Sequence, residues 1–184
     1  DRGICFLRDK GIRPTHIVGD FDSASGDALE YFRRFPEIPI RKFNPVKDLT
    51  DTEIAMDLAI ELGAERIFIL GGTGTRLDHV VANIKLLAMA LEQGKECILL
   101  DEHNRIRLTD QPMNIRKTEQ YGKYVSLFAF GGQVTGLTLR GLFYPLTEYD
   151  MTPENPIGVS NEITAENGEI SFSSGMLLVM ESKD

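Results

Sequence analysis

Over its first 110 residues, the chain alternates between short runs rich in β-branched residues and longer segments with apolar residues at helical spacing. This alternation is typical of βα units arranged around a parallel sheet. The pattern predicts strands at 16–19, 39–43, 67–70 and 97–100, and helices at 25–35, 51–62 and 78–93. A further helix-like stretch follows almost directly after Asp1, so we expect a Rossmann-like α/β domain that lacks its first strand here.

The helix predicted from Thr50 to Leu62 has clear signals at both ends. Thr50 and Glu53 form a capping box, and Gly63 supplies the left-handed residue that ends the helix. Its expected buried stripe consists of Ile54, Ala55, Leu58, Ala59 and Leu62. The four apolar residues 67–70 that come next predict a strand covered on both faces.

The pattern changes near residue 110, and from Tyr124 onward polar and apolar residues alternate with a period of two. Strands are expected at 124–130, 134–139, 168–173 and 176–180, with a turn at Gly131-Gly132. This predicts an all-β sandwich or small barrel of antiparallel strands. We therefore expect an α/β domain at 1–110 and a β-sandwich domain at 111–184.

The amino-acid composition argues against some classes of function. The chain has 184 residues, of which 42% are hydrophobic, and a formal net charge of −8. The negative charge disfavours a nucleic-acid surface, which needs clustered Lys and Arg. Cys5 and Cys97 lie among apolar neighbours and are expected to be reduced thiols. Since no membrane span or leader is recognisable, we expect a cytoplasmic protein.

The first candidate cluster, Gly19-Asp20-Phe21-Asp22-Ser23, comes directly after a predicted strand. Carboxylates at this end of a parallel strand point into the crevice where such sheets bind ligands, and Mg²⁺ prefers carboxylate oxygens. The alternative is a turn in which the aspartates cap backbone donors.

The second cluster, Lys47-Asp48-Leu49-Thr50-Asp51, lies between a strand and a helix. Helix capping accounts for Thr50 and part of Asp51, but it does not explain why Lys47 and Asp48 lie at the same place.

The third cluster, Gly71 to His79, is a glycine-rich turn before a helix, where backbone amides can approach an anion. It has neither the Walker A nor the Rossmann glycine spacing. Arg76 is suited to phosphate oxygens and precedes Asp78 by two residues. His79 has an alternative role as a hydrogen-bonding residue at the helix start. Because strand ends converge in a parallel sheet, we expect the acids of the three clusters to share a cation.

In this order and spacing, the three clusters resemble the thiamine pyrophosphokinase family. The motifs are Gly-Asp-Phe-Asp-Ser at 19–23, Lys-Asp-Leu-Thr-Asp-Thr-Glu at 47–53 and Gly-Gly-Thr-Gly-Thr-Arg-Leu-Asp-His at 71–79. Asn83 also fits, and segments 141–146 and 160–162 resemble the family's thiamine-binding domain.

The resemblance implies transfer of a pyrophosphoryl group from ATP to the hydroxyethyl group of thiamine, giving thiamine diphosphate and AMP. Asp20, Asp22 and Asp51 would hold Mg²⁺, and Asp48 and Asp78 would lie in the same catalytic pocket. Thiamine would contact Ser160 and Asn161, in a homodimer whose sites lie at the subunit interface. The residues expected at ATP are Ser23, Lys47, Thr50, Gly72, Thr73, Gly74, Arg76, His79 and Asn83.

The residues alone leave other functions open. A magnesium-dependent phosphoesterase or nucleotidyltransferase would also use aspartates at strand ends. A nucleotide-sensing module would bind ATP without turnover, and residues 111–184 could serve only dimerisation. The sequence does not identify a general base, and the chain has no Trp, so an aromatic contact to thiamine would come from Phe or Tyr.

Overall fold

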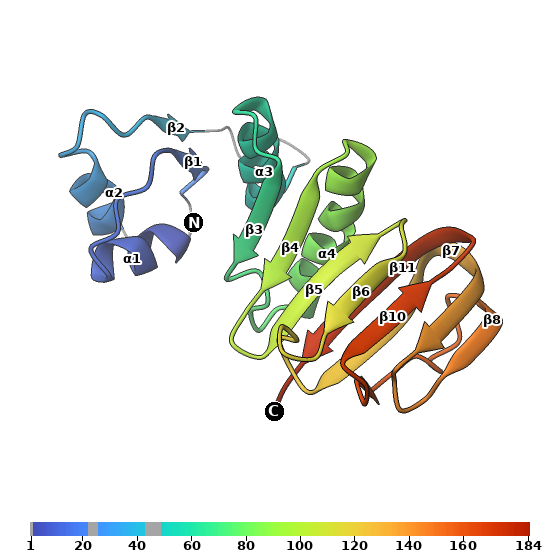
Figure 1. Cartoon of the computed structure of the whole chain (residues 1–184). Coiled ribbons are helices and arrows are strands. Elements are labelled where there is room, and N and C mark those ends of the chain that lie inside the picture. The colour runs from blue at the N-terminus through green and yellow to red at the C-terminus, as the bar shows by residue number, and fades with distance from the viewer. Residues whose placement is uncertain (1, 22–25, 43–48) are drawn as a thin grey trace. The chain divides into compact units, whose positions relative to one another are not determined.

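The computed structural model describes residues 2–21, 26–42 and 49–184 (Figure 1). Asp1–Ala64 and Glu65–Asp184 form two compact units. Asp22, Ser23, Lys47 and Asp48 of the predicted site lie outside the described residues.

The first unit contains three helices and two short strands among its described residues. They are α1 (Arg2–Asp9), β1 (Ile17–Gly19), α2 (Gly26–Phe32), β2 (Ile40–Lys42) and α3 (Asp51–Glu61). β1 and β2 pair in parallel, with Ile17 opposite Ile40. Ile4, Ile17 and Phe32 are buried in one cluster, so α1, β1 and α2 share a core.

Helix α3 begins as predicted. The Thr50 hydroxyl accepts a hydrogen bond from the Glu53 backbone N–H at 3.2 Å, and Gly63 follows the helix with a φ of 86°. Its predicted buried stripe is partly wrong. Ile54, Met56 and Leu58 are buried, whereas Ala55 and Leu62 are exposed.

The second unit begins with β3 (Arg66–Leu70), α4 (Leu77–Glu92) and β4 (Glu96–Leu100). The strands that follow are β5 (Asn104–Thr109), β6 (Met113–Arg116), β7 (Tyr124–Arg140), β8 (Leu146–Met151), β9 (Asn161–Glu162), β10 (Asn167–Ser171) and β11 (Ser174–Ser182). They form one sheet in the order β3-β4-β5-β11-β7-β10-β6, with β8 and β9 also paired to β7. β3 and β4 are parallel, and the other neighbours are antiparallel.

The second unit is therefore a mixed sheet with a strand-rich second part. β5 pairs with β4 on one side and with β11 on the other, so strands on both sides of residue 110 belong to one sheet. The described residues form only two parallel pairs, β1–β2 and β3–β4.

The expected turn at Gly131-Gly132 is wrong, because β7 continues through both residues. Gly131 has a φ of 72°, and the pairing of β7 with β11 shifts register between Met176 and Ser174. Glycine tolerates this left-handed conformation inside a strand, where an irregularity bends the sheet without ending it. β7 consequently pairs with β11 in its first half and with β10 and β8 in its second.

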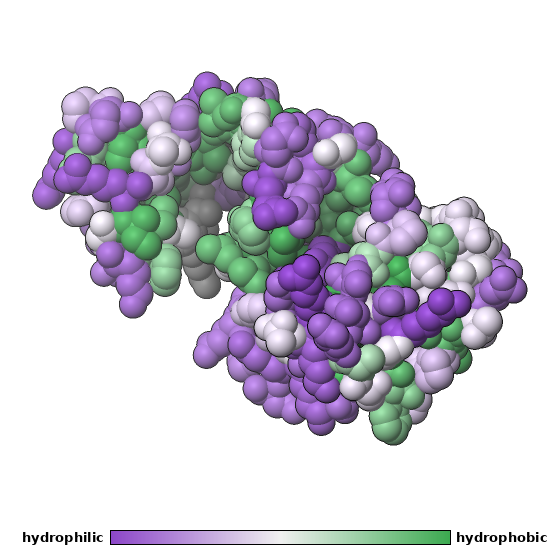
Figure 2. Space-filling view, viewed as in Figure 1, coloured by the Kyte–Doolittle hydropathy of each residue, from purple (hydrophilic) through white to green (hydrophobic). Residues whose placement is uncertain are grey.

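The core of the strand-rich part lies on one face of these strands. Val125, Leu127, Val134 and Leu139 alternate along β7 with less buried residues, and all four are nearly inaccessible to solvent. The face of this part seen in Figure 2 is mostly hydrophilic, as expected for antiparallel strands with one solvated face.

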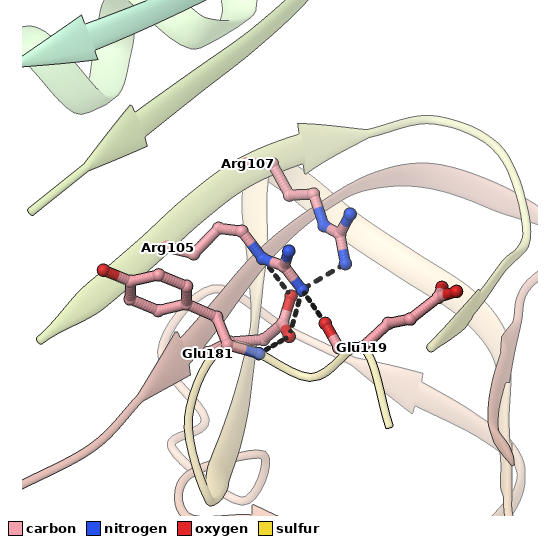
Figure 3. Close-up of polar contacts among 5 residues, drawn as sticks. Arg105, Arg107, Glu119 and Glu181 are labelled. Atoms are coloured by element: carbon pink, nitrogen blue, oxygen red, sulfur yellow. Dashed lines mark hydrogen bonds and ion pairs between the residues drawn. The ribbon is translucent and has the colours of Figure 1, made fainter. Parts of the chain in front are cut away.

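Glu181 on β11 is a buried carboxylate with an exposed fraction of 0%. It accepts hydrogen bonds from Arg105 and Arg107 of β5 and from the backbone N–H of Tyr121 (Figure 3). These contacts join two neighbouring strands to the segment before β7.

Among the described residues, no helix has the length and apolar content needed to span a membrane.

Candidate functional site

The glycine-rich turn between β3 and α4 has little room at its second glycine. A Cβ on Gly72 would lie 2.6 Å from Leu99 Cδ1 and 3.0 Å from Ile69 Cγ2, whereas one on Gly74 would meet nothing within 4 Å. Gly71 has a φ of 74°, which a residue with a side chain rarely adopts. The turn is therefore packed tightly at Gly72 and open at Gly74.

Asn83 on α4 holds this turn from the interior. Its side chain is 5% exposed, and its Nδ2 donates a hydrogen bond to the Gly72 carbonyl at 2.8 Å. A buried carbonyl without such a donor would be costly. The structure thus gives Asn83 a contact with the turn itself, and its predicted contact with ATP stays a prediction.

Arg76 and Asp78 form an exposed pair at the start of α4. Arg76 Nη2 lies 2.5 Å from Asp78 Oδ2, and Asp78 Oδ1 also accepts the His79 backbone N–H at 3.0 Å. The hydrogen bond from Arg76 is the main reason why the pKa of Asp78 falls to about 2. Asp78 therefore remains ionised at neutral pH, and the exposed His79 contributes to this contact with its backbone.

Asp101 is a residue of this region that the sequence analysis missed. Leu70 of β3 pairs with Leu100 of β4 in parallel register, so the glycine-rich turn and Asp101 follow the same end of neighbouring strands. Burial raises the pKa of Asp101, but hydrogen bonds from Thr73, His103 and Asn104 outweigh it and leave the pKa below its ordinary value. The rule applied to the other strand ends would have found Asp101, since it directly follows the strand predicted at 97–100.

The first unit carries the acids predicted to bind metal. Asp20 follows β1 and Asp51 is the first residue of α3, and both are half-buried. Phe21 has a φ of 64°, an unusual conformation for a bulky residue that is often found at functional sites. No group of three metal-binding side chains occurs among the residues with described positions, which exclude Asp22 and Asp48. The shared cation stays a prediction.

Ser160 and Asn161 lie beside a pocket of about 530 Å³ in the strand-rich part. Ser160 is exposed and has a φ of 57°. Other residues that line the pocket are Leu139, Tyr144, Leu146, Ile157 and Val159. The pocket therefore combines apolar walls with a few polar groups, as is common for small-molecule sites.

Asn161 is only 3% exposed, and its side chain is occupied by backbone groups. Its Oδ1 accepts the N–H groups of Tyr144 and Glu162, and its Nδ2 donates to the Tyr144 carbonyl. Asn161 thus fixes the backbone of Tyr144, a residue of the pocket wall within the segment 141–146 that resembles the family's thiamine-binding domain.

Comparison with known proteins places these features in context. Residues 1–99 match the family model described as thiamin pyrophosphokinase, catalytic domain, and residues 111–177 match that described as thiamin pyrophosphokinase, vitamin B1 binding domain. The thiamine pyrophosphokinase of Bacillus subtilis (strain 168) is 31% identical over 184 residues, which cover 100% of this chain and 86% of the relative.

Solved structures give the same result. The crystal structure of thiamine pyrophosphokinase from Bacillus subtilis has a TM-score of 0.92 and 33% identity, covering 100% of this chain and 86% of the other. The thiamin pyrophosphokinase from Geobacillus thermodenitrificans has a TM-score of 0.85 and 32% identity, covering 100% and 84%. The thiamin pyrophosphokinase from Candida albicans, at 20% identity, shares the fold with a TM-score of 0.78 and covers 99% and 79%.

Proposed function

The chain belongs to the thiamine pyrophosphokinase family, and on this premise we propose that it transfers the pyrophosphoryl group of ATP to the hydroxyethyl group of thiamine, giving thiamine diphosphate and AMP. The observation that carries the proposal is the glycine-rich turn before α4, whose Gly72 is fixed by Asn83 while Gly74 remains open. Backbone amides presented in this way suit the phosphates of a nucleotide.

We assign ATP to the second and third motifs and to Ser23. Arg76 supplies a cation for a phosphate oxygen, with Gly72, Thr73 and Gly74 supplying backbone groups. The other nucleotide contacts that the family motifs imply are assigned to Lys47, Thr50, His79 and Asn83. Transfer of this kind depends mainly on positioning and charge neutralisation, which these residues provide.

Mg²⁺ is the metal that fits the acids of the first unit. Asp20 and Asp51 offer hard carboxylate oxygens that are half-buried, and together with Asp22 they would hold the ion. When bound, Mg²⁺ would neutralise charge on the triphosphate.

Asp48 and Asp78 are assigned to the same acidic pocket. Asp78 is hydrogen-bonded to Arg76, which lowers the pKa of its carboxyl to about 2, and we assign it to orienting Arg76.

Thiamine is assigned to the pocket beside Ser160. The exposed Ser160 hydroxyl offers a polar contact, and Asn161 contributes by holding the Tyr144 backbone at the pocket wall. The apolar walls suit a flat heterocycle.

The organisation predicted from the sequence belongs to this proposal. Residues 1–110 would act as a Rossmann-like α/β catalytic domain, an assignment supported by the parallel pairs β1–β2 and β3–β4. Residues 111–184 would bind thiamine in a cytoplasmic homodimer whose sites lie at the subunit interface.

Incubation with ATP, Mg²⁺ and thiamine tests the function directly. We expect AMP and thiamine diphosphate to form in equal amounts, and only when thiamine is present. Asp51→Asn should lower kcat at least 100-fold with an unchanged melting temperature, since it removes a charge and keeps the shape. Asp57→Asn makes the same change further along α3 and serves as the control.

Two outcomes would overturn the proposal. AMP release that is independent of thiamine would indicate a phosphoesterase. Tight ATP binding without turnover in the presence of thiamine would indicate a nucleotide sensor.

A further inference from the structure

The segment before β9 bulges where it runs alongside β7. Val125 of β7 pairs with Asn161 of β9. In a regular antiparallel ladder, Leu127 would then lie opposite Val159. Its N–H donates to the carbonyl of Gly158 at 2.9 Å, one residue further from Asn161. Two steps along β7 therefore correspond to three steps along the facing segment, which is the arrangement of a β-bulge, here formed by residues 158–160.

The first residue of the bulge has to be a glycine. Gly158 is buried, and a Cβ at this position would lie 2.2 Å from the Leu127 carbonyl oxygen. A residue with a side chain would push the segment away from β7, and glycine in such a place marks the close approach of two backbones. The bulge is therefore in direct backbone contact with β7 at Gly158.

The last residue of the bulge, Ser160, has an unfavourable backbone conformation. Its φ is 57°, a value that costs free energy for a residue other than glycine. The Ser160 backbone N–H donates a hydrogen bond to the Ser126 hydroxyl oxygen of β7 at 3.0 Å. A side chain of the neighbouring strand thus opposes the relaxation of Ser160 to a more favourable conformation.

The bulge also forms part of the wall of the pocket beside Ser160. Gly158, Val159 and Ser160 all line this pocket, and both Val159 and Ser160 are exposed. Within the described part of the chain, the lining does not include Ser126. Ser126 therefore reaches the pocket through the backbone of Ser160.

We propose that Ser126 is a positioning residue for thiamine, which acts through the Ser160 N–H to hold the bulge in the conformation that presents the Ser160 hydroxyl to the pocket. The inference rests on the proposed function, in which thiamine contacts Ser160. It adds a residue outside the motifs that define the family resemblance. In this arrangement, Ser126 contacts neither thiamine nor the reacting atoms.

Ser126→Ala tests the proposal, because it removes the acceptor of the Ser160 N–H and leaves the lining of the pocket unchanged. The KM for thiamine should rise about fivefold, the effect of losing one neutral hydrogen bond. Both kcat and the KM for ATP should stay within about twofold. Ser126→Thr keeps the hydroxyl and suits a strand, so it should restore the wild-type KM for thiamine. Ser171→Ala, at an exposed position of β10, is the matched control and should change no kinetic constant.

A double-mutant cycle separates positioning from a general structural effect. Ser160→Ala removes the hydroxyl but keeps the N–H that Ser126 binds. If Ser126 acts by placing that hydroxyl, Ser126→Ala should add less than about twofold to the KM for thiamine when Ser160→Ala is already present. The proposal is overturned if the two effects multiply, if Ser126→Ala raises both KM values together, or if Ser126→Thr behaves like Ser126→Ala.

Calorimetric titration with thiamine distinguishes failure of this inference from failure of the proposed function. Thiamine should bind to Ser126→Ala about fivefold more weakly than to the wild type, and to Ser126→Thr with wild-type affinity. If the wild type binds thiamine but forms no thiamine diphosphate, the proposed function fails, while the order of thiamine affinities still decides the role of Ser126. A wild-type protein that binds no thiamine would overturn both.

Discussion

Two buried asparagines have the same physical role in the two predicted binding regions. Asn83 is hydrogen-bonded to the backbone of the glycine-rich turn, and Asn161 is hydrogen-bonded to the backbone of Tyr144. An amide can both donate and accept. Asn83 donates to the Gly72 carbonyl, and Asn161 both donates to and accepts from the backbone of Tyr144. Both residues were predicted to contact ligands; both are buried, and those contacts stay predictions.

Asn161→Ala should therefore lower the free energy of unfolding and raise the KM for thiamine more than the KM for ATP. The change leaves the Tyr144 N–H and carbonyl without their buried partner, at a cost of about 1–3 kcal/mol. Chemical unfolding measures this cost, and the KM for thiamine should rise while that for ATP stays constant. Asn114→Ala, on the exposed side of β6, should change neither. An unaltered KM for thiamine in Asn161→Ala would show that Tyr144 does not shape the site.

The pairing of Arg76 with Asp78 predicts a pH dependence at the start of α4. The pKa of Asp78 is depressed to about 2 from 3.8, so the contribution of the pair is present above pH 3.8 and is lost as the pH falls through about 2. Arg76→Gln should raise the pKa of Asp78 toward its ordinary value. An NMR titration of the carboxyl carbon measures the shift, and an unchanged pKa would contradict the pairing.

Among the structural elements, β3, α4 and the glycine-rich turn between them show how packing determines the conformation of a turn. Gly72 is buried against Leu99 and Ile69, so no side chain fits between the turn and its neighbours at this residue. Gly74 has free space around its Cα and carries no such constraint. The two glycines differ in a way that their positions in the sequence do not reveal.

Gly72→Ala should destabilise the protein by about 1–3 kcal/mol, because the added methyl group overlaps with the tightly packed Leu99 side chain. Gly74→Ala should leave stability within about 0.5 kcal/mol of wild type, since its methyl group meets no neighbour. Thermal unfolding of the two variants compares them directly. Equal loss in both would mean that backbone freedom, rather than packing at Gly72, determines the effect.

Local signals predicted the elements of the first 100 residues well, because caps, glycines and periodicity act over one or two turns. The Thr50 cap and the strands β1 to β4 were located within about two residues. Burial was harder, since it depends on distant partners. Phe68 and Leu70 were expected to be covered, and both are exposed. The motifs found the glycine-rich turn, Asn83 and the segment that contains Tyr144. They did not reveal that Asn161 holds the Tyr144 backbone, because the two residues are 17 positions apart in the sequence.

At the scale of the whole second unit, the last strand closes the structure. β11 lies between β5 and β7, so residues at the end of the chain complete a sheet begun by β3. Alternation alone cannot give this order, because strands of similar pattern can pair in many ways. The observed strand order also explains why the Gly131-Gly132 segment does not form a turn, since β10, β8 and β11 pair along almost the whole length of β7.

The buried Glu181 allows a test of how strongly the position of β11 in the sheet depends on a single charge. Its carboxylate receives hydrogen bonds from Arg105 at 2.9 and 2.6 Å, from Arg107 at 2.8 Å and from the Tyr121 N–H at 2.9 Å (Figure 3). Burial lowers the pKa of Arg107, and the charge of Glu181 opposes that effect. Without the carboxylate, two guanidinium groups would face each other in a site of low polarity.

Glu181→Gln keeps the volume of the side chain and removes the charge, so it separates electrostatics from packing. It should lower the free energy of unfolding by about 3–5 kcal/mol, the usual cost of breaking a buried ion pair from one side. Urea unfolding measures the loss, and Glu169→Gln, on an exposed position of β10, is the control. A loss below about 1 kcal/mol would mean that solvent already screens Arg105 and Arg107, and that β11 is held by its backbone pairing and apolar contacts.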